Sequence, residues 1–370
     1  MTPVRVAIIG GGLAGLSAAA QMAAVGITDC LLLEARDRLG GRILSVSADG
    51  SGRVEAAQLD LGPTWFWPAF QPELDALVDA LGLARFAQPG QGDGLVERSA
   101  SLPPMRYPGG IGMADAFRLR GGMGALVEAL RGRIDAAKVV TLVAVRALRR
   151  TREGVEIEAV DAAGRGVRVH AGHVLLAVPP RVAEAAITFT PALPPALAAA
   201  WRATPTWMAP HAKYVAVFGR PFWREVGLSG MAQSAVGPLA EIHDASQPDG
   251  VAALFGFVGL PALARRTIPA DVLRAHCRAQ LVRLFGAAAG TPRAEYFEDW
   301  ATDPRTATPA DLAGPADHVP APAARAAEGP WRDALTGIAS EWSPQFPGYL
   351  AGAIEAARLG TERFLRVAAI

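Results

Sequence analysis

The segment VRVAIIGGGLAGLSAAAQMAAVGITDCLLLEARDRLGGR, residues 4–42, decides the fold of this 370-residue chain. Residues 4–9 are apolar except for Arg5, which is typical of a strand buried on both faces of a parallel sheet. A glycine-rich turn follows, and then an alanine-rich segment to about Val25 that predicts a helix. Residues 30–33 form a second apolar run, which ends at Glu34. This order predicts a βαβ unit at the start of the chain.

The turn between the first predicted strand and the helix, residues 10–15, reads GGGLAG and contains GxGxxG. Gly10 permits the tight turn, Gly12 lets the backbone approach a pyrophosphate, and Gly15 lets helix and strand pack closely. Glu34 lies 19 residues after Gly15, where its carboxylate would accept ribose hydroxyls. A glycine turn that binds nothing is the alternative, which strand, helix and terminal acid together disfavour. The pattern predicts a dinucleotide site and leaves FAD and NAD open.

Composition excludes several classes of function. The chain is 51% hydrophobic and 19% charged, with a net charge of +1 and no basic block, so we expect no nucleic-acid or membrane partner. Cys30 and Cys277 are far apart in the sequence and form no CxxC, which argues against disulfides and favours a cytoplasmic location. The six histidines show no metal-ligand spacing, so we expect no metal site.

Lys213 interrupts the apolar run HAKYVAVF, residues 211–218. The chain has 36 Lys and Arg residues, and only Lys138 and Lys213 are lysines. On a strand, Lys213 shares a face with Val215 and Val217. A buried ammonium group is costly, so such a lysine pairs, loses its proton or borders a wet cavity. A lysine that extends from an edge strand into solvent is the alternative.

Residues 5–45 resemble the N-terminus of the flavin-containing amine oxidase family, which includes monoamine and polyamine oxidases. Within these residues, EARDRLGGR (34–42) favours FAD, because Gly40 and Gly41 permit close approach of the backbone and Arg42 can hold a pyrophosphate. Seven further segments resemble the family in the same order along the chain: LDLGPTWFW (59–67), RGGMGALVEAL (120–130), VAVRAL (143–148), HVLLAVPP (173–180), MAPHAKYVAVFGRPFWREVGLSG (208–230), FEDWATDP (297–304) and SEWSPQFPGYLAGAIEAA (340–357).

The resemblance implies two catalytic residues. Lys213 would hold a water that bridges to flavin N5, and Tyr349 would lie beside the ring and help to position the amine, although core packing is an alternative for Tyr349. A helix that begins near Gly348 would direct its positive end at the N1/C2 edge of the flavin. The residues that the resemblance assigns to FAD binding are Gly10, Gly12, Leu13, Ala14, Gly15, Glu34, Ala35, Arg36, Gly40, Gly41, Arg42, Gly62, Pro63, Thr64, Trp65, Val145, Trp300, Glu341, Gly348 and Tyr349.

The chain departs from the family pattern at three places. No cysteine follows Trp300 in WATDPRTATPA, so we expect FAD to be bound noncovalently. The second aromatic residue of the amine cage is missing, and Trp300, Trp65 and Trp67 all stay open as replacements. Only 58 residues separate Gly62 from Gly121, so the substrate cavity is either more open or completed by a second copy in a homodimer.

The expected fold class is α/β, with a Rossmann-like FAD-binding domain of residues 1–72, 113–200 and 300–370. An inserted α+β substrate-binding domain, a mixed sheet plus helices, would comprise residues 73–112 and 201–299. The expected reaction oxidises a small-molecule amine to an imine, with hydride transfer to flavin N5 and reoxidation by O2 to H2O2. Two alternatives stay open, namely a related FAD-dependent desaturase or dehydrogenase that acts on C–C bonds and a catalytically idle FAD-binding protein.

Overall fold

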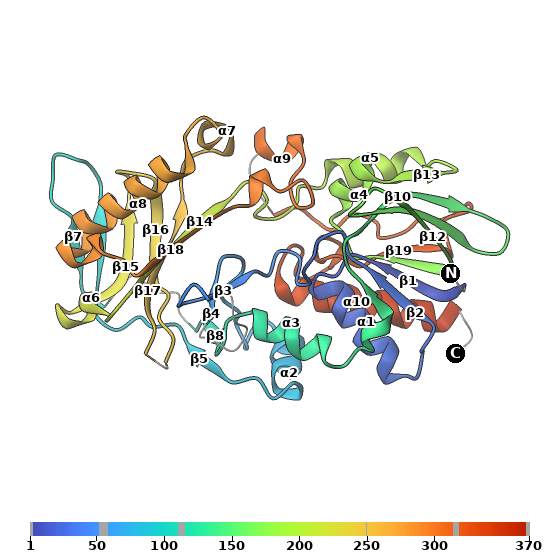
Figure 1. Cartoon of the computed structure of the whole chain (residues 1–370), viewed down its shortest axis with the longest axis horizontal. Helices are drawn as coiled ribbons and strands as arrows, with labels where there is room; N and C mark the ends of the chain where they lie inside the picture. The colour runs from blue at the N-terminus through green and yellow to red at the C-terminus, as the bar shows by residue number, and fades with distance from the viewer. Residues whose placement is uncertain (1–2, 52–57, 110–114, 249, 314–317, 368–370) are drawn as a thin grey trace. The chain divides into compact units, whose positions relative to one another are not determined.

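The computed structural model of the chain describes residues 3–51, 58–109, 115–248, 250–313 and 318–367. The chain forms two compact units, each assembled from separate segments (Figure 1). Unit 1 comprises residues 1–43, 126–209 and 304–370, and unit 2 comprises residues 44–125 and 210–303. One domain boundary that the sequence predicts, between residues 112 and 113, lies outside the described residues. The assignment of FAD to one domain and substrate to the other stays a prediction.

Unit 1 is built on an eight-stranded sheet whose main path runs β13-β10-β11-β12-β1-β2-β9, with β19 paired to β12. The long strand β12 joins two parts of this sheet, because it pairs antiparallel with β11 and parallel with β1 and β19. The strands are β1 Val4–Ile9, β2 Cys30–Leu33, β9 Val139–Val140, β10 Val143–Arg150, β11 Val155–Asp161, β12 Gly166–Leu176, β13 Thr188–Thr190 and β19 Leu335–Gly337.

The predicted βαβ unit is present at the start of the chain. Strands β1 and β2 pair in parallel and are connected by helix α1, Leu13–Ala24, which ends one residue before Val25. Helix α1 packs against the C-terminal helix α10, Leu350–Val367, as Figure 1 shows. The other helices of this unit are α4 Pro180–Ala186, α5 Pro195–Ala203 and α9 Pro309–Ala313, with the 3₁₀ turns η1 Ala136–Lys138 and η4 Ser340–Trp342. Along the sequence, the change from unit 2 to unit 1 after residue 125 falls within α3, Gly124–Arg131.

Unit 2 is built on a seven-stranded mixed sheet in the order β18-β14-β17-β16-β15-β6-β7. Its pairs are antiparallel except for β15 and β6, which are parallel. The strands are β6 Asp93–Glu97, β7 Met105–Tyr107, β14 Ala212–Phe218, β15 Leu228–Ser234, β16 Leu239–Asp244, β17 Ala252–Val258 and β18 Ala294–Asp299. Two two-stranded antiparallel sheets accompany it, formed by β3 Ser45–Ser47 with β4 Gln58–Asp60, and by β5 Arg85–Ala87 with β8 Phe117–Leu119.

Strand β14 is buried along its whole length, and its two faces contribute to different cores. Tyr214, Ala216 and Phe218 belong to a cluster that includes Cys277 and Leu281 of helix α8. Val215 and Val217 belong to a second cluster. Period-2 alternation therefore places Lys213 on the second face, as the sequence predicts. The helices of unit 2 are α2 Pro72–Ala80, α6 Phe222–Glu225, α7 Ala262–Arg265 and α8 Ala270–Phe285, with η2 Ala287–Gly290 and η3 Trp300–Thr302.

These two units confirm the predicted α/β class, with a Rossmann-like βαβ element in one unit and a mixed sheet plus helices in the other. The parallel pairing of β1, β2 and β12 involves the buried apolar ends of β1 and β12 and the wholly buried β2, as is typical of strands covered on both faces of a sheet. None of the helices in the described part of the chain is both long and apolar enough to cross a membrane.

Candidate active site

The glycine turn of unit 1 contains two glycines that the fold itself requires. Gly10 has φ of +107°, and its N–H donates to the carbonyl of Leu33 at 2.8 Å. At Gly15, an added Cβ would lie 1.9 Å from the carbonyl oxygen of Gly10. A side chain at either position therefore strains the backbone or collides with it.

Gly12 differs from its neighbours, because the protein itself leaves room for a side chain there. Its φ of −74° and ψ of −177° are ordinary extended values, and an added Cβ would come no closer than 3.8 Å to another atom, the Cα of Gly41. Gly12 is the N-cap of α1, where the backbone N–H groups of Leu13 and Ala14 begin the helix. The missing side chain at this helix N-terminus fits a pyrophosphate, which pairs with N–H groups at such a position.

Glu34 is 3% exposed and lies directly after β2. Its Oε2 accepts from the N–H of Gly11 at 2.6 Å, and its Oε1 accepts from the N–H of Arg36 at 2.7 Å. A carboxylate offers about four lone-pair positions, so these two bonds orient the group and leave acceptor capacity for ribose hydroxyls. Ala35 lies between Glu34 and Arg36 in the sequence. The guanidinium of Arg36 donates to Thr306 Oγ1 at 3.0 Å.

The second pair of glycines, Gly40 and Gly41, packs against the first turn. Both have positive φ, +99° and +59°, and the N–H of Gly40 donates to the carbonyl of Gly11 at 2.8 Å. An added Cβ at Gly41 would lie 3.1 Å from the Cα of Gly12. The two glycine loops therefore support one another, which is a structural role that the sequence analysis did not assign to them.

Arg42 forms an ion pair with Glu341. The distances are 2.6 Å from Nη1 to Oε1 and 3.0 Å from Nη2 to Oε2, and Nη2 also donates to Ser340 Oγ at 3.1 Å. Glu341 is 3% exposed. The bidentate contact that the sequence suggests for a pyrophosphate is thus made with Glu341, and a phosphate would share or exchange this partner.

Three more residues that the sequence assigns to FAD lie in unit 1. Val145 lies on β10 at a β-bulge, where the register shifts between Val145 and Ala147. Gly348 has φ of +86°, and an added Cβ would lie 2.5 Å from the Cβ of Trp207. Tyr349 directly precedes α10 and is 37% exposed. Its exposure argues against simple core packing.

Two aromatic residues that the sequence analysis missed lie beside Tyr349. The His318 ring stacks on Trp207 with centroids 3.5 Å apart, and it lies nearly parallel to the Tyr349 ring at 4.7 Å. His318 Nδ1 lies 3.1 Å from the carbonyl oxygen of Pro347. Burial lowers the pKa of His318, and this hydrogen bond opposes the shift. Trp207 directly precedes the segment at 208–230 that resembles the family, whereas His318 lies in a proline-rich stretch that carries no such signal.

In unit 2, Lys213 is 2% exposed. Its Nζ donates to the carbonyl of Gly62 at 3.1 Å and to Thr64 Oγ1, and it lies 4.0 Å from the centroid of the Phe255 ring. Burial lowers the pKa of Lys213 to about 7, the negative charge of Asp60 raises it, and the positive charge of Arg118 lowers it further. The alternative of a solvent-exposed lysine is therefore wrong, because β14 is an internal strand of the sheet.

Lys213 and Trp300 hold the segment that contains Gly62, Pro63, Thr64 and Trp65. The Nε1 of Trp300 donates to the carbonyl of Leu61 at 3.1 Å, one residue before the carbonyl that Lys213 binds. The structure thus brings together Lys213, Trp300 and the segment at 62–65, which the sequence assigns separately to one site.

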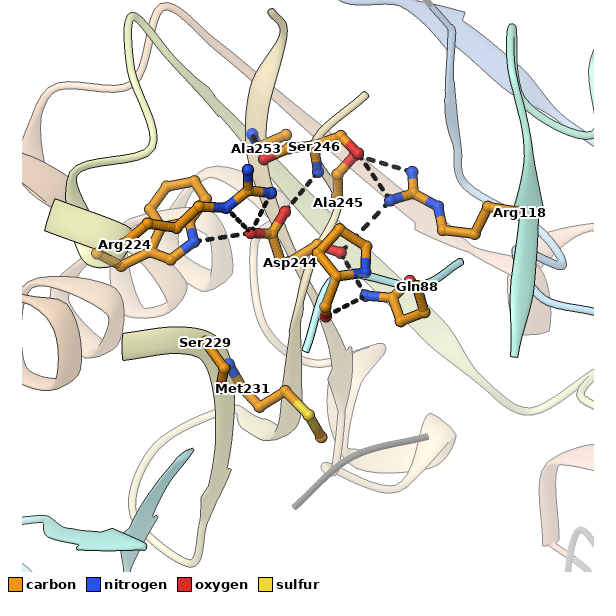
Figure 2. Close-up of polar contacts among 11 residues, drawn as sticks. Gln88, Arg118, Arg224, Ser229, Met231, Asp244, Ala245, Ser246 and Ala253 are labelled. Carbon is orange, nitrogen blue, oxygen red and sulfur yellow. Dashed lines mark hydrogen bonds and ion pairs between the residues drawn. The ribbon is translucent and has the colours of Figure 1, made fainter. Parts of the chain in front are cut away.

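Trp65 is anchored by a polar network that Figure 2 shows in part. Trp65 Nε1 donates to Gln88 Oε1 at 2.8 Å, and Gln88 Nε2 donates to the carbonyl of Asp244 at 2.8 Å. Arg118 donates to the next two carbonyls, those of Ala245 at 2.8 Å and Ser246 at 3.0 Å. Because Arg118 is 1% exposed, these bonds fix the bend after β16 with a buried cation.

Neither cysteine is suited to a covalent cofactor bond. Cys30 lies on β2 and Cys277 in α8, both are buried, and burial raises the pKa of each thiol to about 12. Nucleophilic attack requires the thiolate, which burial disfavours here. Among the described residues, no group of three or more His, Cys, Asp or Glu side chains is arranged to hold a metal ion.

Two family models match the chain. The model described as flavin containing amine oxidoreductase matches residues 98–363, which is more than half of the chain. A model described as an NAD(P)-binding Rossmann-like domain matches residues 8–81, which include the glycine turn and Glu34.

Curated relatives match over short segments. Putrescine oxidase from Kocuria rosea is 44% identical over 88 residues, which is 24% of this chain and 17% of that protein. Polyamine oxidase 1 from Zea mays is 39% identical over 61 residues, which is 16% of this chain and 11% of that protein. The chain therefore aligns with less than a fifth of the length of these relatives.

Solved structures match over nearly the whole chain. Cyclohexylamine oxidase from Brevibacterium oxydans IH-35A has a TM-score of 0.79 and 18% identity, with 100% of both chains covered. A structure of putrescine oxidase bound to putrescine has a TM-score of 0.77 and 20% identity, with 99% of both chains covered. At these identities the similarity shows the fold.

Proposed function

The chain belongs to the family of flavin-containing amine oxidoreductases, and from this premise we propose that it binds FAD noncovalently and oxidises a small amine at a carbon–nitrogen bond. The observation that carries the proposal is Lys213, a lysine buried on an internal strand that binds Gly62 and Thr64. A globular core does not need such a group, and buried titratable residues with shifted pKa values concentrate at functional sites.

The fit of unit 1 to a dinucleotide supports FAD as the cofactor. The turn at Gly12 would hold the pyrophosphate, Glu34 would hold the ribose, and the backbone near Val145 would contact the adenine. When bound, FAD supplies the two-electron acceptor that takes the hydride equivalent from the substrate at N5 and is reoxidised by O2 to give H2O2. The buried, protonated state of both cysteines supports noncovalent binding.

Lys213 is suited to hold a water molecule. Its ammonium form has three donors, and the bonds to Gly62 and Thr64 engage two of them. A pKa of about 7 makes both the charged and the neutral amine accessible near neutral pH, so the group both donates to and accepts from a bound water. An arginine keeps its charge and has no such neutral form.

Tyr349, with Trp207 and His318 beside it, would orient the substrate amine. Aromatic faces attract amines and their cations, and these rings provide a partly exposed aromatic surface in unit 1. The substrate reacts as the neutral amine, whose C–H bond breaks as its nitrogen lone pair forms the C=N bond. Water then hydrolyses the imine to a carbonyl compound and an amine or ammonia.

The electron acceptor and the assembly state are further parts of the proposal. We propose O2 as the acceptor, and we propose a homodimer in which a second copy completes the substrate cavity, because the stretch between Gly62 and Gly121 is short. A cytoplasmic location stays a prediction from cysteine usage. Oxygen consumption during turnover and light scattering coupled to size-exclusion chromatography test the first two points directly.

The primary test is a visible spectrum of the purified protein, followed by anaerobic addition of primary, secondary and polyamines. We expect a flavin band that at least one amine bleaches. A band that no amine bleaches would favour the desaturase or idle-protein alternatives, and a protein that binds no FAD would overturn the proposal.

The second test compares Lys213→Met with Lys138→Met, which changes the other lysine of the chain and therefore provides a matched control. Lys138 ends the short turn η1. We expect Lys213→Met to retain FAD and to lose at least about tenfold in turnover or in reoxidation rate, as for loss of a positioned proton-transfer group. Equal activity of the two variants would refute the role of Lys213.

A further inference from the structure

Asp60 is another buried charged residue of unit 2, far from Lys213 in the sequence but near enough to interact with it electrostatically. It ends strand β4, is 5% exposed and lies two residues before Gly62, whose carbonyl binds Lys213. Its Oδ1 accepts from Ser45 Oγ at 2.6 Å and from the N–H of Met123 at 2.8 Å. Its Oδ2 is also buried and has no hydrogen-bond partner among the described residues. A buried oxygen of this kind needs either a nearby cation or a proton.

Two cations interact electrostatically with Asp60, and both are buried. One is Lys213, and the other is Arg118, which is 1% exposed and whose terminal nitrogens bind the carbonyls of Ala245 and Ser246. The guanidinium of Arg118 keeps its charge, because arginine does not lose its proton in proteins. The lysine and the carboxylate are therefore the two members of this cluster that can exchange a proton with solvent.

Burial acts on these two groups in opposite senses. Burial raises the pKa of Asp60, while the bond from Ser45 and the charges of Lys213 and Arg118 lower it. For Lys213, burial lowers the pKa to about 7, the charge of Asp60 raises it, and Arg118 lowers it. With one permanent cation present, ionised Asp60 balances Arg118 alone when Lys213 is neutral, and it faces two cations when Lys213 is charged.

The remaining charged groups on this face of the sheet are farther away or already engaged. Glu298 on β18 is the cross-strand partner of Lys213, and it has an interaction of its own. Glu241 on β16 is two strands away, is partly exposed and lies 2.6 Å from His243 Nε2. Solvent screens such partly exposed groups more strongly than it screens the buried cluster.

We propose that Asp60 is a positioning residue for Lys213. The carboxylate of Asp60 favours the protonated form of the lysine amine, and the positive charge of Arg118 disfavours it. The cluster of Asp60, Arg118 and Lys213 then determines how often the lysine presents a neutral amine near neutral pH. The effect on the charge of Lys213 stands independently of FAD, whereas its consequence for turnover rests on the function proposed above.

The test is an NMR titration of the protein as purified, labelled with ¹³C and ¹⁵N in lysine only. The chain has two lysines, so two side-chain signals are expected, and Lys213→Met identifies which one belongs to Lys213. In the wild type we expect the Lys213 signal to titrate near neutral pH. In Asp60→Asn we expect its midpoint to fall by roughly one pH unit or more, because an adjacent opposite charge is lost.

Asp60→Asn retains an oxygen that accepts from Ser45 and Met123, so it removes the charge with little change in shape. The matched control is Asp79→Asn, an exposed carboxylate of the same unit that pairs with Arg85 and should leave Lys213 unchanged. If Asp60→Asn does not fold, Ser45→Ala is the second variant. It removes the hydroxyl that stabilises the carboxylate, so the Lys213 midpoint should fall in the same direction by a smaller amount.

A Lys213 midpoint in a folded variant that stays within about 0.3 pH unit of the wild type overturns the inference, since one nearby charge normally shifts a pKa by more than this. Turnover measured across the same pH range separates this inference from the proposed function. If the midpoint moves and the pH profile of turnover moves with it, both stand. If the midpoint moves and the profile does not, Asp60 controls the charge of Lys213 and the catalytic role of the lysine fails.

Discussion

The glycine turn of unit 1 differs in its physical basis from the cluster of Asp60, Arg118 and Lys213 in unit 2. In the turn, a side chain added at Gly12 would meet no atom closer than 3.8 Å, and Glu34 keeps acceptor capacity after two backbone bonds. In the cluster, three buried charged groups interact electrostatically, and one carboxylate oxygen of Asp60 has no hydrogen-bond partner among the described residues. The turn depends on shape and backbone N–H groups, whereas the cluster depends on the balance of buried charge.

This difference makes separate, ordered predictions. Substitutions in the turn should divide into those that disrupt the fold and those that affect only the ligand. The effects of substitutions in the cluster should depend on pH, because they change the protonation equilibrium of Lys213.

The largest effect is expected at Gly15. The Cβ of Gly15→Ala would lie 1.9 Å from the Gly10 carbonyl oxygen, so we expect a loss of about 4 kcal/mol or more in the free energy of unfolding. Gly12→Ala is the matched substitution, with ordinary backbone angles and no atom within 3.8 Å of the new Cβ. We expect the apoprotein of this variant to stay within about 0.5 kcal/mol of the wild type, as is usual for substitutions away from packed sites.

Flavin titration then completes the comparison of the two glycines. Gly12→Ala should bind FAD at least about tenfold more weakly, which corresponds to about 1.4 kcal/mol, because its methyl group fills the space for the pyrophosphate. Denaturant unfolding of the apoprotein and FAD binding by fluorescence provide both values. Unchanged FAD affinity in Gly12→Ala would show that the space in front of α1 is not the ligand site.

How far the sequence predicts these regions depends on how local each feature is. The βαβ unit and its glycine turn were predicted because strand, turn and helix signals are contiguous between residues 4 and 34. The face that Lys213 occupies was also predicted, because side-chain alternation on a strand is a local rule. The functional roles assigned to Lys213, Tyr349 and the FAD-binding residues stay predictions.

Features that join distant segments could not be read from the sequence. The ion pair of Arg42 with Glu341 spans 299 residues, and the stacking of His318 on Trp207 depends on loop packing that no periodic pattern encodes. Asp60 lies in the segment 59–67 that resembles the family, but the sequence assigns it no role, because its importance comes from burial and from its interaction with two cations. Sequence patterns predict elements and the faces of elements, whereas tertiary packing determines which charges meet.

The larger of two pH-dependent effects is expected for the stability of unit 2 between pH 6 and 9. Lys213 has a pKa of about 7 in the folded protein and 10.5 as its ordinary value, so the unfolded chain binds the proton more tightly between these limits. Stability should therefore rise with pH, and between pH 6 and 9 we expect Lys213 to contribute an increase of about 3 kcal/mol. In Lys213→Met this contribution should be absent, while Lys138→Met should retain it. Parallel curves for the two variants, measured by denaturant unfolding, would contradict the burial argument.

The smaller of the two pH-dependent effects is expected for a buried base in unit 1. His173 is 3% exposed, its Nδ1 lies 3.0 Å from the carbonyl oxygen of Asp333, and its Nε2 lies 3.1 Å from Thr336 Oγ1. The neutral ring satisfies both contacts by donating to the carbonyl and accepting from the hydroxyl. Burial lowers the pKa of His173 to about 4, and the bond to Asp333 opposes the shift.

A depressed histidine pKa places the sensitive range of unit 1 below neutral pH, in contrast to the range above pH 7 for Lys213. Between pH 7 and pH 5 the unfolded chain takes up a proton on His173 that the folded protein does not, so unfolding should become easier by about 2 kcal/mol. His173→Gln keeps a polar group but cannot titrate, and it should show a correspondingly flatter loss of stability over this range. His276→Gln, at a histidine in helix α8 of unit 2, serves as the control and should keep the wild-type slope. If both variants lose stability on acidification as the wild type does, the neutral state of His173 does not determine the acid sensitivity of unit 1. The proposed difference between the pH ranges in which His173 and Lys213 affect stability would then fail.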